Sequence, residues 1–302
     1  MEQAIALTHL RKTYGDVIAV DDVSFDVAPN EIFGIIGPNG SGKTTTVECL
    51  QGLRVADRGE IRVLGMDPRT EGEALRRRIG SQLQESALPD RLKVWEALDL
   101  FATASAKSAD WRAEAREWGI YDRRNAAFAD LSGGERQRLF VALALITNPE
   151  LVFLDEMTTG LDPAARRVAW SLIEAVRQRG ATVVLVTHFM DEAEHLCDRI
   201  GVFLRGRVVD VDSPSRLVAK HNPSSRVRFS TEEADLSWLS GVPGVQKLER
   251  RGARVEVVGS GPLLAQLAAA LVGHGIAPPD LRVDLPTLEE AYMALTQEGG
   301  LA

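Results

Sequence analysis

A glycine-rich stretch that ends in lysine and threonine has the residue types and spacing of a phosphate-binding loop. Residues 37–44 read Gly-Pro-Asn-Gly-Ser-Gly-Lys-Thr, after the apolar run 32–36 and before a predicted helix. Such a loop lets backbone N–H groups surround phosphate oxygens at a positive helix N-terminus. Lys43 would reach the terminal phosphates, and the Thr44 hydroxyl would take one Mg²⁺ position. The residues predicted to contact the nucleotide are Gly37, Pro38, Asn39, Gly40, Ser41, Gly42, Lys43, Thr44 and Thr45.

A glycine-rich turn with an incidental lysine is the alternative. The spacing, the preceding strand and the following helix all agree with a phosphate loop and argue against that alternative.

Two carboxylates end another predicted strand, which reads Leu-Val-Phe-Leu-Asp-Glu over 151–156. Asp155 stands where an open α/β sheet places ligand groups, and it suits an Mg²⁺ partner held through water. Glu156 can orient and deprotonate a water that attacks the terminal phosphate. A strand end meeting solvent would also carry two acids, but the phosphate loop upstream favours the catalytic interpretation.

Three further side chains lie close to the ends of predicted strands. Gln84 follows the strand-like run 79–83, so it could touch Mg²⁺ or the attacking water. His188 follows the predicted strand 181–187 and can hydrogen-bond a γ-phosphate, although a lone histidine is usually structural. Tyr14 could stack on an adenine base, or it could be a half-buried tyrosine at a strand end. Its position in the chain does not decide between these two.

Ser132, Gly133 and Gly134 form a second glycine-rich turn, before the predicted helix 139–146. A serine hydroxyl and a helix N-terminus there could bind another phosphate group. An ordinary serine cap is the alternative. Asp162, followed by proline, is either a nucleotide contact or the cap of the next helix.

The elements that must position these side chains are strands alternating with helices, which predicts an α/β fold. Strands are expected over 4–10 and 17–27, and helices within 93–118. Trp111 and Trp118 share one helix face, and they are expected in the core because no basic residues accompany them as a base-stacking platform would require.

Composition excludes several classes of protein. The 302 residues exceed the usual size of one core and predict two domains. With 35 Lys and Arg against 43 Asp and Glu, the net charge of −8 argues against nucleic acid as a partner. Apolar runs such as 183–186 are too short to span a bilayer, and no signal-peptide pattern opens the chain, so we expect a cytoplasmic location. Cys49 and Cys197 lack metal-ligand spacing and are expected to be inert.

Together these motifs resemble the ATP-binding subunit of an ATP-binding-cassette (ABC) transporter. Segments 37–44, 151–156 and 131–135 are similar to the Walker A loop, the Walker B strand and the family signature. The remaining matches are the D-loop at 160–162, the switch histidine His188, the adenine-stacking Tyr14 and the Q-loop Gln84. The motifs keep the family's order over about residues 4–215, and the signature distinguishes this family from other Walker A proteins.

The resemblance implies an ATPase with ATP and Mg²⁺ as ligands and a P-loop fold of mixed sheet and helices over 1–216, with a helical subdomain over about 85–148. It also implies a head-to-tail dimer in which Ser132 and Gly134 of one chain complete the ATP site of the other. The residues that the other chain supplies are Lys43, Thr44, Asp155 and Glu156. Two positions depart from the family's pattern: Glu135 replaces the commoner glutamine, and Met157 replaces the usual proline.

The tail, over 224–302, is expected to be a small α+β domain of ferredoxin-like βαββαβ order, after a linker at 221–225. Its first helix is predicted over 234–239. The last segment, 286–296, opens with a Thr-x-x-Glu capping box and predicts an amphipathic helix. It also resembles a C-terminal motif of ABC-2 type drug, antibiotic or sodium exporters.

The leading hypothesis is therefore an ATPase subunit that powers a separately encoded membrane permease, placed at the inner face of the membrane by that permease, with export as the direction. A soluble ABC ATPase that acts on ribosomes or DNA is the alternative. A small-molecule kinase would use the Walker A loop but would leave the signature and His188 unexplained.

Overall fold

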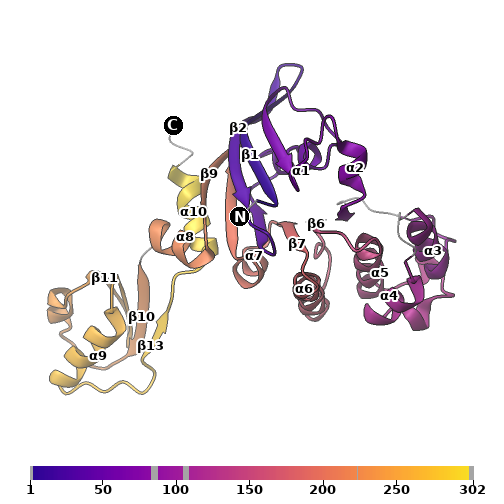
Figure 1. The fold of residues 1–302 in the computed structure, drawn as a ribbon. Coiled ribbons are helices and arrows are strands. Elements are labelled where there is room, and N and C mark those ends of the chain that lie inside the picture. Colours follow the sequence, from indigo (N-terminus) through magenta and orange to yellow (C-terminus); the bar gives the residue numbers. More distant parts are fainter. Residues whose placement is uncertain (1–2, 83–87, 105–108, 223, 299–302) are drawn as a thin grey trace. The chain divides into compact units, whose positions relative to one another are not determined.

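The computed structural model describes residues 3–82, 88–104, 109–222 and 224–298 (Figure 1). The chain divides into two compact units, unit 1 over residues 1–214 and unit 2 over 215–302. No helix in the described residues is both long enough and apolar enough to cross a membrane.

Unit 1 is built on a six-stranded sheet of order β5-β6-β7-β3-β8-β9. Neighbouring strands run parallel except β9, which is antiparallel to β8. Every residue of β3, β6 and β7 is buried, as expected for parallel strands covered on both faces. The strands are β3 (Ile32–Ile36), β5 (Ile79–Gln82), β6 (Leu151–Asp155), β7 (Thr182–Val186), β8 (Arg199–Leu204) and β9 (Arg207–Asp212).

A three-stranded antiparallel sheet of order β2-β1-β4 packs on the parallel sheet through a shared core. Phe25 of β2 stacks on Phe33 of β3 with ring centroids 5.0 Å apart, and it meets Phe203 of β8 edge-on at 6.2 Å. The core therefore fixes β3, and with it the start of the loop that follows. The strands are β1 (Ile5–Tyr14), β2 (Val17–Val27) and β4 (Arg58–Val63).

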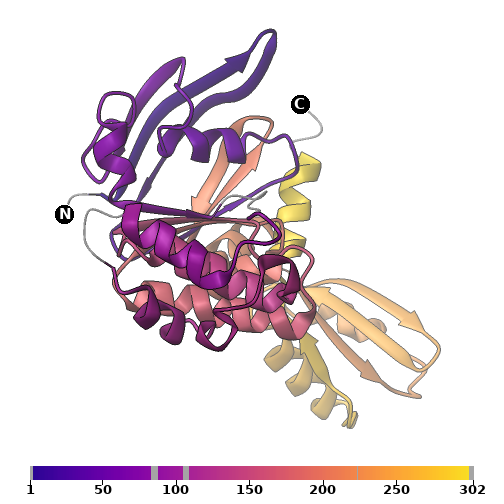
Figure 2. The same cartoon turned by 90° about the vertical axis from the view of Figure 1, so that its right-hand side faces the viewer.

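The helices of unit 1 cover both faces of the parallel sheet, with α6 and α7 on the face away from β1 and β2 (Figures 1 and 2). Helix α6 is amphipathic and buries Ala169, Leu172, Ile173 and Val176. Four of the helices of unit 1 are α1 (Lys43–Leu50), α2 (Gly72–Arg76), α6 (Pro163–Gln178) and α7 (Met190–Leu196).

A helical part projects from the sheet (Figure 1) and contains α3 (Val94–Ala104), α4 (Trp111–Glu117) and α5 (Gly133–Leu145), with 3₁₀ turns at Tyr121–Arg123 and Phe128–Asp130. Trp111 and Trp118 are buried, at 8% and 2% exposure, which confirms that they belong to the core.

Unit 2 is a four-stranded antiparallel sheet of order β11-β12-β10-β13 with α9 on one face. The predicted helix over 234–239 is wrong: the chain forms a short 3₁₀ helix, η3 (Ser237–Gly241). The segment around Asp235 instead folds as a turn, in which the Asp235 carboxylate accepts a hydrogen bond from the Ser237 N–H at 2.9 Å. The elements are β10 (Ser225–Ser230), β11 (Val245–Arg251), β12 (Arg254–Gly259), α9 (Leu263–Gly273) and β13 (Arg282–Asp284).

Two helices flank this sheet in the sequence, α8 (Pro214–His221) and α10 (Leu288–Glu298). The capping box predicted for the last helix is present, since Glu290 N donates to Thr287 Oγ1 and Thr287 N donates to Glu290 Oε2, both at 3.3 Å. Helix α8 ends at His221 and strand β10 begins at Ser225, so the linker expected over 221–225 is wrong at those two residues.

Candidate nucleotide site

The candidate nucleotide site lies at the carboxyl ends of the central strands of the parallel sheet. Strands β6, β7 and β3 are parallel neighbours, so their carboxyl ends meet there. The loop after β3 leads to Lys43, β6 ends at Asp155, and His188 follows β7. Residues more than a hundred positions apart in the sequence are thereby brought together.

Two glycines of the loop after β3 are required by both their backbone angles and their surroundings. Gly37 has φ +157° and Gly42 has φ +93°. A Cβ atom would lie 2.3 Å from the Phe203 carbonyl oxygen at Gly37 and 2.4 Å from the Ala19 carbonyl oxygen at Gly42. Any side chain at either position would push the loop off β8 or β2.

Lys43 opens α1, is 6% exposed, and folds back onto its own loop. Its Nζ donates hydrogen bonds to the carbonyl oxygens of Gly37 at 2.8 Å and Pro38 at 2.9 Å. Burial lowers the pKa of Lys43, whereas the charges of Glu156 and Asp155 oppose that shift. The ammonium group thus lies among the loop and both carboxylates, within reach of a phosphate.

Asp155 is 4% exposed, and burial together with the neighbouring Glu156 raises its pKa to about 6, with Lys43 acting in the opposite direction. Within the described residues its Oδ1 and the Ser41 Oγ are buried without a hydrogen-bond partner. Thr44, on the first turn of α1, is exposed. Unsatisfied carboxylate and hydroxyl oxygens are the ligand type that Mg²⁺ prefers, so this donor set fits the cation.

Glu156 follows β6 in a left-handed conformation, with φ 49°. Its N–H donates to the Val186 carbonyl oxygen at 2.9 Å, which ties it to the end of β7. The side chain is 10% exposed, and its Oε1 lies 3.3 Å from His188 Nδ1. A non-glycine residue at positive φ is uncommon, and here it directs a carboxylate toward the histidine.

Ser132 caps α5 in the structure. Its Oγ accepts a hydrogen bond from Glu135 N at 3.4 Å, and its N–H donates to Glu135 Oε2 at 2.8 Å. The carboxylate at position 135 therefore completes a capping box, and Arg123 lies 3.0 Å from it. Gly133 lies against the loop that precedes α6, since a Cβ on Gly133 would contact the Leu161 side chain at 3.5 Å.

Asp162 caps α6, because its Oδ1 accepts hydrogen bonds from the N–H groups of Ala164 at 2.9 Å and Ala165 at 2.8 Å. Contact of Asp162, Ser132, Gly133 or Gly134 with nucleotide stays a prediction. Met157, at the second departure from the family's pattern, is buried at 1% exposure.

Tyr14 ends β1 and is 40% exposed. Lys12 Nζ lies 5.5 Å and the Arg54 guanidinium carbon 5.9 Å from the centre of the ring. Gln84 lies outside the described residues, and its role stays a prediction.

Sequence reasoning missed Glu192, which is fully buried in α7. The acidic run at 191–194 is typical of the first turn of an exposed helix, so nothing in the pattern marks one of its carboxylates as internal. Only the packing of α7 against α6 could reveal it.

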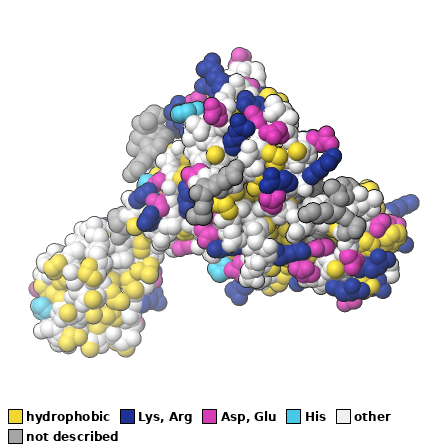
Figure 3. All heavy atoms as spheres, viewed as in Figure 1, with side chains coloured by type: hydrophobic (Ala, Val, Ile, Leu, Met, Phe, Trp, Pro, Cys, Tyr) yellow, Lys and Arg dark blue, Asp and Glu magenta, His cyan; other side chains and the backbone are white. Residues whose placement is uncertain are grey.

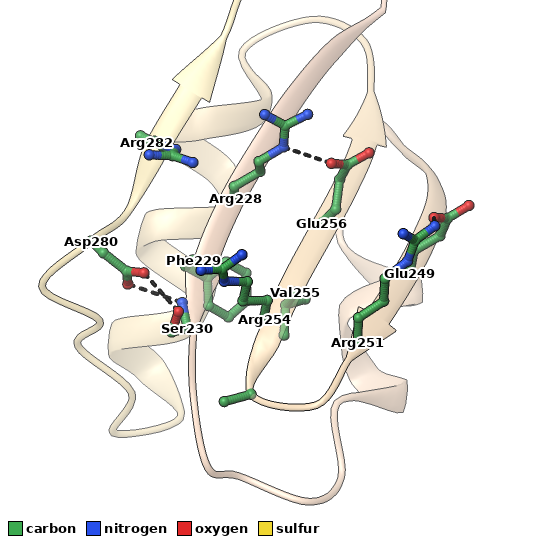
Figure 4. Close-up of a pocket in the computed structure, with 11 residues that line it drawn as sticks. Arg228, Phe229, Ser230, Glu249, Arg251, Arg254, Val255, Glu256, Asp280 and Arg282 are labelled. Carbon is green, nitrogen blue, oxygen red and sulfur yellow. Dashed lines mark hydrogen bonds and ion pairs between the residues drawn. The ribbon is translucent and has the colours of Figure 1, made fainter.

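Unit 2 holds a pocket of about 870 Å³ on the sheet face that carries charged side chains (Figure 4). Arg228 Nε lies 2.6 Å from Glu256, and the same guanidinium lies 2.6 Å from Asp284. Ser230 Oγ donates to Asp280 at 2.7 Å. None of the residues predicted for the nucleotide site lines this pocket.

Known proteins resemble the chain along its whole length. A family model described as ABC transporter matches residues 20–159. A Nod factor export ATP-binding protein I of Rhizobium sp. (strain N33) is 36% identical over 299 residues, which cover 97% of each chain. A daunorubicin resistance ATP-binding protein of Streptomyces coeruleorubidus is 36% identical over 98% of this chain and 96% of its own.

Solved structures agree with these relatives. An ATP-binding subunit of an ABC transporter is 28% identical with a TM-score of 0.64, over 72% of this chain and 92% of that one. A dimeric ATP-binding cassette in a post-hydrolysis state with ADP and phosphate is 27% identical with a TM-score of 0.63, over 69% and 98% of the two chains. The protein therefore belongs to the ATP-binding proteins of ABC transporters, and it is an ATPase.

Proposed function

We propose that this ATPase drives export through a separately encoded membrane-spanning chain. The observation that carries the proposal is the full-length similarity to proteins named for Nod factor export and daunorubicin resistance, which extends through unit 2. Neither name supplies this chain's cargo. The domain limits proposed are an ATPase domain over 1–216 and an accessory domain over 224–302, close to the division of the structure at Pro214.

In the proposed site, Lys43 exchanges its contacts to Gly37 and Pro38 for phosphate oxygens, which restores the hydrogen bonds that it gives up. Thr44 and Asp155 would hold Mg²⁺, which when bound neutralises charge between the phosphates. The Glu156 carboxylate accepts a proton from the attacking water. His188, 3.3 Å from Glu156, holds that carboxylate in place and reaches toward the terminal phosphate.

The active form proposed is a dimer of two cassettes, supported by the dimeric relative. The N-terminus of α5 supports this role, because Ser132 and Gly133 are exposed and available to a second chain. The phosphate would then favour the closed pair through contacts that exist only in it, and hydrolysis would remove those contacts.

Helix α3 carries apolar side chains that face solvent, which supports a protein partner at the helical part. Leu100 is 61% and Phe101 41% exposed. Hydrophobic side chains also reach the surface in this region of Figure 3, between charged ones. Such residues are expected where a permease docks.

The proposal is tested by isolating the tagged chain from native membranes in mild detergent. The Glu156→Gln variant with MgATP should hold the closed pair, and it should bring down a multi-span membrane protein in stoichiometric amount. Leu100→Glu is expected to weaken that recovery without loss of ATP binding, since it places a charge on the docking surface. Recovery with ribosomes or DNA, and without a membrane protein, would overturn the proposal.

A further inference from the structure

Helix α7 contains a buried carboxylate that has no role in the hydrolysis proposed for Glu156 and His188. Glu192 stands in the first turn of α7 and is 0% exposed. Its Oε1 accepts a hydrogen bond from Trp170 Nε1 of α6 at 3.1 Å. A carboxylate removed from water destabilises a fold unless its neighbours compensate for the lost hydration.

Those neighbours belong to the segments that carry the proposed site. Burial raises the pKa of Glu192, and the nearby hydroxyl groups of Thr187 and Thr158, together with the Trp170 indole, oppose the shift. Thr187 directly precedes His188, and Thr158 follows Glu156 by two residues. Trp170 belongs to α6, the helix that Asp162 caps.

The contact with Thr158 is incomplete. Within the described residues, neither Glu192 Oε2 nor Thr158 Oγ1 has a hydrogen bond of normal geometry, and both atoms are buried. A buried polar atom without a partner is unfavourable, so a hydrogen bond between these two atoms would stabilise the loop after Glu156.

Two of the three neighbours require an acceptor. The Trp170 indole can only donate. Thr187 Oγ1 already accepts the Phe189 N–H at 3.0 Å, which leaves its own hydrogen to donate. A carboxylate offers only acceptors, whereas glutamine would turn an NH₂ group toward one of these donors.

We propose that Glu192 is a positioning residue for ATP hydrolysis, which sets the separation of Glu156 and His188 by offering acceptor oxygens to the hydroxyl groups of Thr158 and Thr187. The proposal rests on the roles proposed above for Glu156 and His188. It concerns the arrangement of the hydrolytic groups and leaves the phosphate loop, and hence nucleotide binding, unaffected.

The test is the Glu192→Gln variant of the full chain, with the exposed Glu194→Gln of the same helix as matched control. We expect kcat to fall about 10- to 100-fold, as for a small misplacement of catalytic groups. The KM for ATP should stay within about twofold, because ground-state binding is unchanged. The stoichiometry of bound nucleotide and the melting temperature are measured beside the rates, so that misfolding is recognised.

A double-mutant cycle with Thr158→Ala separates positioning from general stability. If Glu192 acts through Thr158, the double variant should lose no more than the stronger single variant. Losses in kcat that multiply, or a fall in melting temperature without a fall in kcat, would overturn the proposal. If Glu156→Gln retained full turnover, the role proposed for Glu156 would be wrong. If only Glu192→Gln retained full turnover, the role proposed for Glu192 would be wrong and that of Glu156 would stand.

Discussion

The nucleotide site of unit 1 and the charged sheet face of unit 2 both gather ionisable residues, but they satisfy them in opposite ways. At the site, Asp155 Oδ1 is buried without a hydrogen-bond partner within the described residues, and burial shifts the pKa of both Asp155 and Lys43. On the sheet face, Arg228 pairs with Glu256 and Asp284, and these side chains are partly exposed to water.

The difference separates a place prepared for a ligand from a solvated surface. Groups that are buried and unsatisfied gain contacts only when something binds, whereas exposed pairs already have both each other and water. Pocket volume does not distinguish a ligand site from a solvated surface, because the pocket of about 870 Å³ lies on the solvated sheet face of unit 2.

The largest effect is expected at Glu156, where a single buried carboxylate carries the proton transfer. Glu156→Gln should cut ATP turnover by about 10²- to 10⁴-fold while nucleotide still binds. Phosphate release and nucleotide binding are measured side by side, with the exposed Glu174→Gln as control. If the Glu156→Gln variant turned over ATP as fast as the parent chain, Glu156 would not be the catalytic base, and the nucleotide site would not differ in this way from the sheet face of unit 2.

The charge of Asp155 is expected to oppose folding in the nucleotide-free chain. Its pKa of about 6 lies above the ordinary 3.8, so the folded state holds the proton more tightly than the unfolded state. This group's cost is absent below about pH 4 and grows as the pH rises to about 6, to at most about 3 kcal/mol.

Asp155→Asn should therefore raise the free energy of unfolding at neutral pH by about 1–3 kcal/mol and flatten its pH dependence, while hydrolysis of MgATP falls. Denaturant titrations at mildly acidic and neutral pH check this. A variant less stable than the parent at neutral pH would show that the carboxylate is already satisfied without a ligand.

The Ser132 cap lies between the two extremes, since it is exposed and yet proposed to serve a ligand. Ser132→Ala removes one capping hydrogen bond and should cost about 1 kcal/mol of stability. Turnover should fall further than that loss explains if the serine meets the partner's nucleotide. Glu135→Gln, which keeps the capping box, is the control for the cap. If the loss of folded protein fully explained the fall in turnover, Ser132 would serve only as a helix cap.

The smallest effect is expected on the sheet face. Glu256→Gln should change stability by less than about 0.5 kcal/mol, because exposed ion pairs contribute little, and it should leave ATP turnover unchanged. Thermal unfolding and the same turnover assay measure both. A change comparable to that of Asp155→Asn would show that the face is not merely solvated.

Most of the local elements could be predicted from the order of the amino acids. The glycines and lysine of 37–44 specify a phosphate loop, because glycine adopts φ +93° at position 42, where a Cβ would lie 2.4 Å from a backbone oxygen. Apolar runs marked the buried strands β3, β6 and β7, and the capping residues Ser132, Asp162 and Thr287 marked helix starts. These signals act over a few residues and need no distant partner.

Which of those elements come into contact depends on the tertiary structure. The order β6-β7-β3 places His188 3.3 Å from Glu156, and it is set by packing between distant segments. The burial of Glu192 follows from α7 packing on α6, and the 3₁₀ turn at Ser237–Gly241 replaces a predicted helix. Burial, pKa shifts and unsatisfied atoms are properties of a neighbourhood, and sequence spacing does not specify a neighbourhood.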